Sequence, residues 1–244
     1  FRLFSGNEVG VLLTDFIAKR KVAMGIMPKK PVVVKTIVTT DLANRVADDY
    51  GIETRDVLTG FKYIGDQIAN LEKDGEVDRY LLGFEESYGY LSGSYVRDKD
   101  AVNGAYLIAQ MFAYYKAENK SLLDVLNGLY EKYGYYLNTL YSFEFEGESG
   151  MKKMDAIMDK FRNNTPNDIA GIKVLEVRDY ETSTQIILGT GEKKAIDLPK
   201  SNVIKYMLDG NSCAVLRPSG TEPKLKLYLA ISSENEASAR ELES

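Results

Sequence analysis

Two short segments of the sequence carry most of the side chains that could do chemistry. The first, Arg217-Pro218-Ser219-Gly220-Thr221, brings together a guanidinium, two hydroxyls and a glycine. Gly220 can take the positive φ that turns successive backbone N–H groups toward one point, and Arg217 matches two oxygens of a phosphate. An ordinary hairpin would need neither the arginine nor the paired hydroxyls, so these residue types favour an anion-binding loop.

The second segment follows an apolar strand that ends near Gly83, and it contains Glu85, Glu86 and Ser87. In an extended chain, Glu85 and Ser87 share one face while Glu86 points to the other. A carboxylate can accept hydrogen bonds from two neighbouring sugar hydroxyls, and a serine can add another contact. A solvated acidic hairpin would explain the same residues equally well.

Further candidate ligands lie in the first half of the chain. Lys35 interrupts a strongly apolar run, which is costly unless the ammonium is paired or faces a cleft, although it could also snorkel. Thr59 and Gly60 lie where a strand gives way to a helix, a common place for ligand contacts and equally for a plain helix cap. Arg97 and Lys99 add positive charge just after the Glu85 segment.

Metal and thiol chemistry have little support in this sequence. The chain has no histidine, which excludes histidine metal sites and every catalytic triad that uses one. Asp98 and Asp100 lack a third carboxylate, so Asp100 is better interpreted as the cap of the following helix. Cys213 is the single cysteine, and we expect a buried strand residue in a reducing cytoplasm.

Composition restricts the partners. The 31 basic and 36 acidic residues give a net charge of −5, which argues against nonspecific binding to nucleic acid. No apolar run approaches the roughly 20 residues needed to cross a bilayer, so no membrane partner is expected. Phe1 is neither an initiator methionine nor the start of a signal peptide, and we expect the chain to be part of a longer protein.

The first half of the chain alternates strand and helix signals. Ser5 and Glu8 have the spacing of a capping box before an apolar helix. Strands are expected near 31–40, 52–60 and 79–86, and helices near 41–50, 61–75, 100–118 and 120–132. This alternation predicts a layered α/β/α domain with a mixed sheet over residues 1–136.

The second half changes character. Strict alternation begins near Thr139, a helix is expected from Ser149 or Gly150 to about Phe161, and four or more strands follow. Runs of strands with few helices predict a smaller α+β domain with an antiparallel sheet over residues 137–244.

Four segments together resemble the α-D-phosphohexomutase superfamily, and most closely its phosphoglucomutase branch. "RPSGTEPK" resembles that family's phosphate-binding loop, and "GFEESYGY" resembles its sugar-binding loop. "TGFKYIG" and "VRDKD" are similar to two further segments of the third family domain. The resemblance covers nearly the whole chain and implies domains three and four of a four-domain enzyme.

Roles for single residues follow from this resemblance. It implies that Glu85 and Ser87 hold sugar hydroxyls and that Lys99 assists proton transfer or steadies charge at the active site. It implies that the nonreacting phosphate is held by Arg217, Ser219, Gly220 and Thr221. Contacts with substrate are expected, in addition, from Lys35, Thr59, Gly60 and Arg97.

The resemblance also implies what lies outside this chain. The family's phosphoserine and its aspartate-rich Mg²⁺ loop belong to domains one and two, and nothing here resembles them. The implied enzyme interconverts glucose 1-phosphate and glucose 6-phosphate through glucose 1,6-bisphosphate, and this half alone would be inactive. Phosphomannomutase, phosphopentomutase and a phosphosugar-binding module without catalysis remain alternatives.

Overall fold

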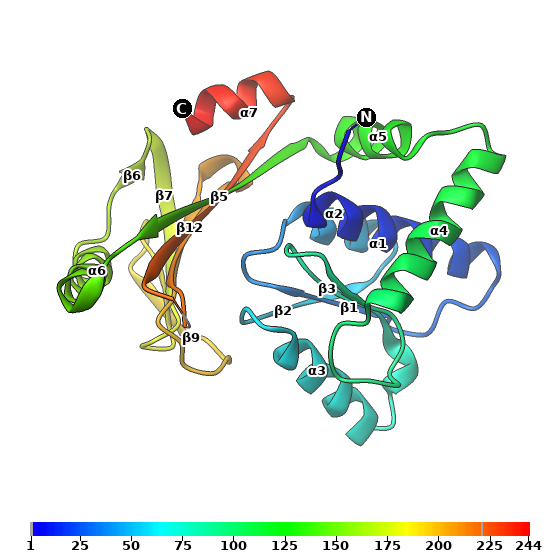
Figure 1. The fold of residues 1–244 in the computed structure, drawn as a ribbon, viewed down its shortest axis with the longest axis horizontal. Helices are drawn as coiled ribbons and strands as arrows, with labels where there is room; N and C mark the ends of the chain where they lie inside the picture. The colour runs from blue at the N-terminus through cyan, green and yellow to red at the C-terminus, as the bar shows by residue number, and fades with distance from the viewer. Residues whose placement is uncertain (1, 221) are drawn as a thin grey trace. The chain divides into compact units, whose positions relative to one another are not determined.

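We describe a computed structural model in which residues 2–220 and 222–244 are placed. The chain forms two compact units, Phe1–Gly134 and Tyr135–Ser244, which Figure 1 shows as a ribbon. Each unit is described here by itself.

The first unit is built around a four-stranded sheet in the order β2-β1-β3-β4. Strands β2, β1 and β3 are parallel, and β4 runs antiparallel to β3, so the sheet is mixed. The strands are β1 (Val32–Thr36), β2 (Glu53–Val57), β3 (Tyr80–Glu85) and β4 (Gly89–Leu91). The α-helices are α1 (Gly6–Ala23), α2 (Leu42–Asp49), α3 (Phe61–Lys73), α4 (Ala101–Ala117) and α5 (Leu122–Tyr133), and a 3-10 turn, η1, covers Val77–Arg79.

Helices cover both faces of this sheet. On one face, Ile64 and Ile68 of α3 pack with Val32 and Val34 of β1. On the opposite face, α1 lies so close to β3 that a Cβ at Gly10 would lie 2.1 Å from the ring of Phe84. Helix α4 is on this second face too, since Gly104 packs on the Tyr90 ring and Tyr90 is the register partner of Phe84. The predicted α/β/α arrangement is therefore confirmed.

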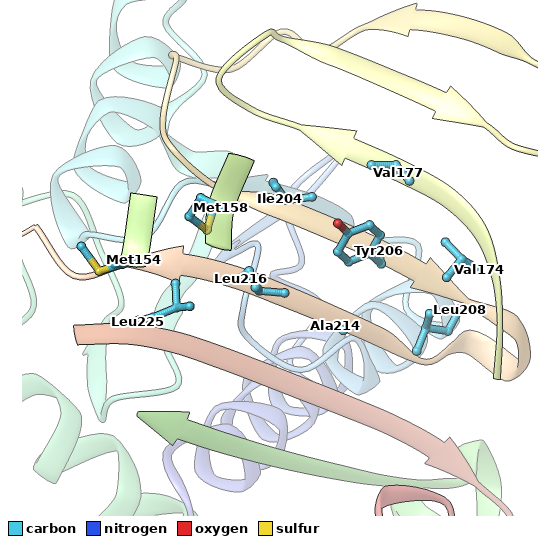
Figure 2. Packing of buried hydrophobic residues seen from close by; sticks show 10 residues of the cluster. All are labelled: Met154, Met158, Val174, Val177, Ile204, Tyr206, Leu208, Ala214, Leu216 and Leu225. Carbon is cyan, nitrogen blue, oxygen red and sulfur yellow. The ribbon is translucent and has the colours of Figure 1, made fainter. Parts of the chain in front are cut away.

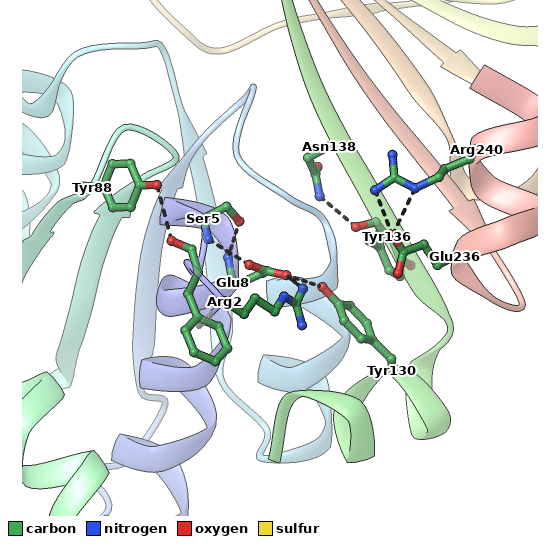
Figure 3. A network of polar contacts seen from close by, with 10 residues as sticks. Arg2, Ser5, Glu8, Tyr88, Tyr130, Tyr136, Asn138, Glu236 and Arg240 are labelled. Atoms are coloured by element: carbon green, nitrogen blue, oxygen red, sulfur yellow. Dashed lines mark hydrogen bonds and ion pairs between the residues drawn. The ribbon is translucent and has the colours of Figure 1, made fainter. Parts of the chain in front are cut away.

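The start of α1 is fixed by the predicted capping box (Figure 3). The Ser5 hydroxyl accepts from the Glu8 backbone N–H at 3.2 Å, and the Glu8 carboxylate accepts from the Ser5 N–H at 2.7 Å. The same carboxylate accepts from the Tyr130 hydroxyl of α5 at 3.3 Å. The cap thus also joins the first and last helices of this unit.

The second unit is built around an antiparallel sheet in the order β5-β12-β11-β10-β7-β8-β9, with β6 paired to β7. Its strands are β5 (Tyr135–Glu144), β6 (Asp168–Ile169), β7 (Ile172–Asp179), β8 (Thr184–Ile187), β9 (Glu192–Ala195), β10 (Ile204–Leu208), β11 (Cys213–Pro218) and β12 (Lys224–Ser233). Two α-helices, α6 (Gly147–Asn163) and α7 (Glu236–Glu243), and a 3-10 turn, η2 (Asp209–Asn211), accompany it. The predicted α+β class is confirmed.

Helix α6 covers part of this sheet (Figure 2). Met154 and Met158 pack on Ile204, Tyr206 and the strand residues around them. The buried Tyr206 hydroxyl donates to the Phe161 carbonyl at 3.0 Å, which satisfies its polar end inside an apolar cluster.

Two predicted boundaries were wrong. Helix α6 begins at Gly147, ahead of Ser149 and Gly150, because the positive φ of Gly147 turns the chain directly after β5. Strand β5 begins at Tyr135, where the ladder with β12 starts, although apolar alternation becomes visible only from Thr139.

Among the described residues, no helix combines the length and the apolar character needed to cross a membrane.

Candidate functional site

The predicted sugar-binding residues lie at the carboxyl edge of the first sheet. Strands β1, β2 and β3 are parallel, so their carboxyl ends meet at one edge. The loops that follow them contain residues 37–41, 58–60 and 86–88. In open α/β sheets this edge is where ligands bind.

Glu85 is the last residue of β3 and only 6% exposed. Its Oε1 accepts from the Gly60 N–H at 3.0 Å, where the chain enters α3. Burial raises the pKa of the Glu85 carboxyl, and the neighbouring Glu86 adds to this, while Lys99 and the Gly60 N–H oppose it. The Glu85 carboxylate is thus held in place by one of its oxygens.

Gly89 marks the point where Glu85 and Lys99 converge. A Cβ at Gly89 would lie 3.1 Å from Glu85 Oε2, 3.1 Å from Lys99 Cδ and 3.3 Å from the Phe61 ring. The Lys99 ammonium lies 5.6 Å from the Phe61 ring centroid and 3.2 Å from Asp98 Oδ1, and its side chain is 53% exposed. The Glu85 carboxylate and the Lys99 side chain therefore both pack closely against Gly89, and a side chain at this position would press on both.

Glu86 has different hydrogen-bond partners from Glu85. Its Oε2 accepts from the hydroxyls of Thr36 at 3.3 Å and Thr39 at 3.2 Å, in and just after β1. Those hydroxyls are 2.8 Å apart. Glu86 thus attaches its loop to the end of β1, and the opposite orientation of the two carboxylates stays a prediction.

The prediction that Ser87 extends the strand was wrong. Strand β3 ends at Glu85, and residues 86–88 form a turn in which Tyr88 has φ 65°. Helix α1 begins directly against this turn, since a Cβ at Gly6 would lie 2.0 Å from the Glu86 carbonyl oxygen. Ser87 is exposed in this turn, so alternation does not place it beside Glu85.

Lys35 is fully buried, and its ammonium forms ion pairs with two carboxylates. Its ammonium lies 2.8 Å from Asp41 Oδ1 and 3.0 Å from Asp56 Oδ1, and it donates to the Thr39 carbonyl at 3.2 Å. Burial by itself lowers the pKa of Lys35, but the carboxylates of Asp56 and Asp41 outweigh it and hold the pKa above its ordinary value. An ammonium has three donors, and all three already have a protein oxygen nearby.

Thr59 and Arg97 have contrasting surroundings. The Thr59 hydroxyl is shielded from solvent and has no hydrogen-bond partner among the described residues, which leaves a polar group that a ligand could satisfy. The Arg97 guanidinium is taken up by the Glu72 carboxylate of α3 and by the carbonyls of Ser94 and Val96. Arg97 thus fastens its own loop to α3.

The predicted anion loop lies at the end of β11 and differs from the expected geometry. Gly220 does not take a positive φ, and the Ser219 N–H donates to the Lys224 carbonyl at 2.7 Å. The expected positive φ at Gly220 is therefore wrong, and the short connection to β12 uses the Ser219 N–H as a donor. Thr221 lies outside the described residues. Ser219 and Gly220 instead border a cavity of about 330 Å³ beside Met151 and Met154 of α6.

Arg217 has a cationic neighbour that the sequence analysis missed. In the antiparallel register, Arg217 lies directly opposite Lys226 of β12, on the face of the sheet that Leu216 and Leu227 do not share. Directly opposed like charges destabilise a ladder unless an anion offsets them. Counting register outward from the Arg217–Lys224 turn would have found Lys226.

The described residues do not fit a Mg²⁺ site. Within residues 2–220 and 222–244, no group of three histidine, cysteine, aspartate or glutamate side chains is arranged to hold a metal ion. Asp100 caps α4, accepting from the N–H groups of Val102 and Asn103 at 2.8 and 3.1 Å, which confirms its predicted role.

Residues 5–133 match the sequence profile of the phosphoglucomutase/phosphomannomutase alpha/beta/alpha domain III, which is more than half of the 244 residues. The chain belongs to the phosphoglucomutase/phosphomannomutase family. The predicted resemblance is confirmed, and the profile contains the whole carboxyl edge that holds Glu85, Gly60 and Lys99.

Relatives in this family are considerably longer. A phosphoglucomutase of Staphylococcus haemolyticus is 39% identical over 95% of this chain, and a Staphylococcus aureus phosphoglucomutase has the same identity and coverage. The chain spans 41% of the length of each of these two relatives.

Solved structures of the family share the fold. The Paramecium parafusin (phosphoglucomutase) structure in its open form covers 97% of this chain with a TM-score of 0.63 at 16% identity. A phosphomannomutase structure from Thermus thermophilus covers 98% with a TM-score of 0.60 at 15% identity. This chain covers 38% and 39% of those two proteins, respectively.

Proposed function

We propose that this chain supplies the sugar-binding and phosphate-binding loops of a phosphoglucomutase that interconverts glucose 1-phosphate and glucose 6-phosphate. The units 1–134 and 135–244 are its third and fourth domains. The observation that carries the proposal is the convergence of Glu85 and Lys99 at Gly89, on the ligand-binding edge of a family domain. The identity of 39% to phosphoglucomutases favours glucose phosphates as the substrate.

Glu85 would hold the sugar. Its Oε1 already accepts a hydrogen bond from the Gly60 N–H. Its Oε2, beside Gly89, is therefore the oxygen that would accept a hydrogen bond from a sugar hydroxyl. Lys99 would contribute positive charge beside it, steadying a phosphate or moving a proton. Since Lys35 and Arg97 are engaged by protein oxygens, we assign them to positioning the loops.

Arg217 and Lys226 would hold the phosphate that is not reacting. Two adjacent cations would recognise only the charge and the oxygen positions of a phosphate group. Either phosphate of a glucose bisphosphate would therefore bind to them. The phosphoryl donor and Mg²⁺ would be held by a region that corresponds to the part of the relatives that this chain does not span. Reorientation of a bisphosphate between two half-reactions would account for both substrates.

Paired substitutions in the longest polypeptide translated in frame with this chain test the proposal. Glu85→Gln is expected to lower kcat/KM for glucose 1-phosphate by about tenfold to a hundredfold, because a hydrogen bond to a charged group is worth roughly 1.5–3 kcal/mol. Glu86→Gln removes the same charge but keeps an oxygen for Thr36 and Thr39, so its effect should be smaller. Equal losses, or activity only with mannose 1-phosphate, would contradict the proposal.

A further inference from the structure

Lys99 lies in an irregular segment, residues 92–100, that joins β4 to α4. Within this range the chain forms no helix or strand. The end of the segment is fixed, because the Asp100 N–H donates to the Tyr90 carbonyl at 3.0 Å. The position of Lys99, one residue earlier, therefore depends on the support under the middle of the segment.

The middle of the segment rests directly on helix α3. A Cβ at the buried Gly65 would lie 2.4 Å from the Arg97 carbonyl oxygen and 3.2 Å from Arg97 Cβ. The Arg97 guanidinium also forms an ion pair with the Glu72 carboxylate of the same helix. The backbone at Arg97 thus occupies the place that a side chain at residue 65 would take.

Lys99 contacts the same side of α3. Phe61, Gly65 and Glu72 are spaced by four and seven residues, which places them on one face of a helix. The Lys99 ammonium lies 5.6 Å from the Phe61 ring centroid, one turn before the contact of Arg97 with Gly65. One face of α3 therefore supports the segment at both Arg97 and Lys99.

The start of α3 also holds the second residue of the proposed sugar site. The Gly60 N–H, at the cap of the helix, donates to Glu85 Oε1 at 3.0 Å. The position of Lys99 relative to the Glu85 carboxylate is thus set by how closely the segment approaches α3. Gly65 is the closest point of that approach.

A methyl group at residue 65 would displace the segment. Ordinary contacts between carbon and a carbonyl oxygen are about 3.3–3.6 Å, so the Arg97 carbonyl would have to withdraw by about 1 Å. The clashing atom belongs to the backbone, which cannot rotate away as the end of a side chain could. The displacement would reach Lys99, two residues further on.

We infer that Gly65 is a positioning residue for Lys99, acting through the Arg97 backbone that rests on it. The inference rests on the proposed function for the role of Lys99 at the sugar site. It adds that the fit of residues 92–100 onto α3 determines how well the Lys99 ammonium is placed.

A double-mutant cycle in the longest polypeptide translated in frame with this chain tests the inference. Gly65→Ala should lower kcat/KM for glucose 1-phosphate by about tenfold to a hundredfold, because misplacing a reacting group by about 1 Å can cost a factor of about 100. Lys99→Met should cause a loss of about tenfold to a hundredfold, the worth of a hydrogen bond to a charged group. Adding Gly65→Ala to Lys99→Met should cost less than about threefold more, since a removed ammonium cannot be misplaced.

Gly128→Ala, on the exposed side of α5, is the matched control. A Cβ there would meet no described atom within 4 Å outside its own helical backbone, so kcat/KM should stay at the wild-type value. Its urea midpoint should rise, because alanine is favoured over glycine inside a helix. Hydrogen exchange of residues 92–100 gives a readout that does not depend on turnover, and it should be faster in Gly65→Ala but unchanged in Gly128→Ala.

Glu72→Gln provides a second variant in case Gly65→Ala does not fold. It weakens the attachment of Arg97 to α3 without introducing a clash, and the Glu72 side chain is 59% exposed. We expect a smaller loss of kcat/KM than for Gly65→Ala, and this loss should likewise disappear in the Lys99→Met background.

Three results would overturn the inference. Gly65→Ala could reduce kcat/KM as strongly in the Lys99→Met background as in wild type, which would mean that the glycine acts through another group. It could leave kcat/KM unchanged although Lys99→Met lowers it. Exchange of residues 92–100 equal to wild type would mean that the segment does not rest on Gly65. Wild-type kinetics of Lys99→Met, by contrast, would contradict the proposed role of Lys99 itself.

Discussion

Glu85 and Lys35 are both buried charged residues close to the carboxyl edge of the first sheet, but their surroundings differ. Lys35 is surrounded by two carboxylates and a carbonyl, whereas Glu85 has one backbone donor and an ammonium nearby. Removing a buried charge that is already paired leaves its partners uncompensated, whereas a buried charge with fewer partners can still bind a ligand. The two residues therefore call for opposite predictions.

We expect Lys35→Met to destabilise the protein. The change would leave Asp41 and Asp56 facing each other without their cation, and breaking a buried pair costs about 3–5 kcal/mol. Chemical denaturation should show this loss, while the exposed Lys62→Met serves as a control near zero. A variant of normal stability with a strongly raised KM would instead make Lys35 a substrate ligand.

The pKa of Glu85 predicts a pH-dependent contribution to stability. Because burial raises this pKa in the folded protein, the native state holds the proton more tightly than the unfolded chain does. The stability that Glu85 contributes therefore falls as pH rises above the ordinary glutamate pKa of about 4.3, and levels off beyond the raised value. Urea midpoints of wild type and Glu85→Gln should diverge with rising pH, the variant becoming relatively more stable.

The exposed Glu118→Gln is the matched control for that comparison. A Glu85→Gln profile parallel to wild type between pH 4 and 8 would mean that Glu85 does not titrate differently on folding. Such a result would also mean that the Glu85 carboxylate is hydrated in the folded protein.

At the scale of elements, the β11–β12 hairpin places Arg217 against Lys226. We expect Arg217→Ala or Lys226→Ala to weaken phosphosugar binding by about one to two orders of magnitude, the worth of a charged hydrogen bond. The thermal midpoint should stay level or rise slightly, because each change relieves a repulsion between opposed cations. Calorimetric titration with glucose 1-phosphate and a thermal melt provide the two readings.

Lys193→Ala, on the exposed strand β9, controls for the loss of one positive charge. If both hairpin variants bound glucose 1-phosphate as tightly as wild type does, the phosphate would not bind at this hairpin. A drop in thermal midpoint for either would show that another anionic group already offsets the pair.

The elements also show what the sequence could and could not predict. Ser5 and Asp100 were recognisable as caps, and the break between α4 and α5 coincides with the positive φ of Asn119, because such signals depend on a few neighbouring residues. The carboxylates around Lys35 and the turn at residues 86–88 were not predictable. They depend on β2 and α1, whose approach is fixed only by the complete packing of the domain.

The same limit applies to the candidate site. Glu85 was recognisable as a candidate because it lies at the end of an apolar strand. The close packing of Glu85 and Lys99 against Gly89 was not predictable, because it depends on which side chains surround the glycine in the folded protein. The Arg217 loop was found from residue types, and its backbone geometry was not, since one hydrogen bond from Ser219 redirected the turn.

For the molecule as a whole, we expect residues 1–244 to fold and to lack mutase turnover. Each unit has its own apolar clusters and complete strand pairing among the described residues, which supports folding. The proposed phosphoryl donor lies outside the sequence, which predicts no turnover. A coupled glucose 6-phosphate assay on protein purified from a host without mutase checks this, and turnover above background would mean that the catalytic groups lie within these 244 residues.

The pairing of β5 with β12 has a consequence for synthesis. Tyr135 is the register partner of Ser233 and Glu144 that of Lys224, and β5 has no other neighbour in the sheet order. A nascent chain leaving the ribosome therefore presents β5 as an unpaired, partly apolar strand until β12 has emerged, while the first unit already has all its strands. Exposed strand edges recruit other chains. The glutamates at 144, 146 and 148 place negative charge where that waiting strand ends, which would keep neighbouring nascent chains apart.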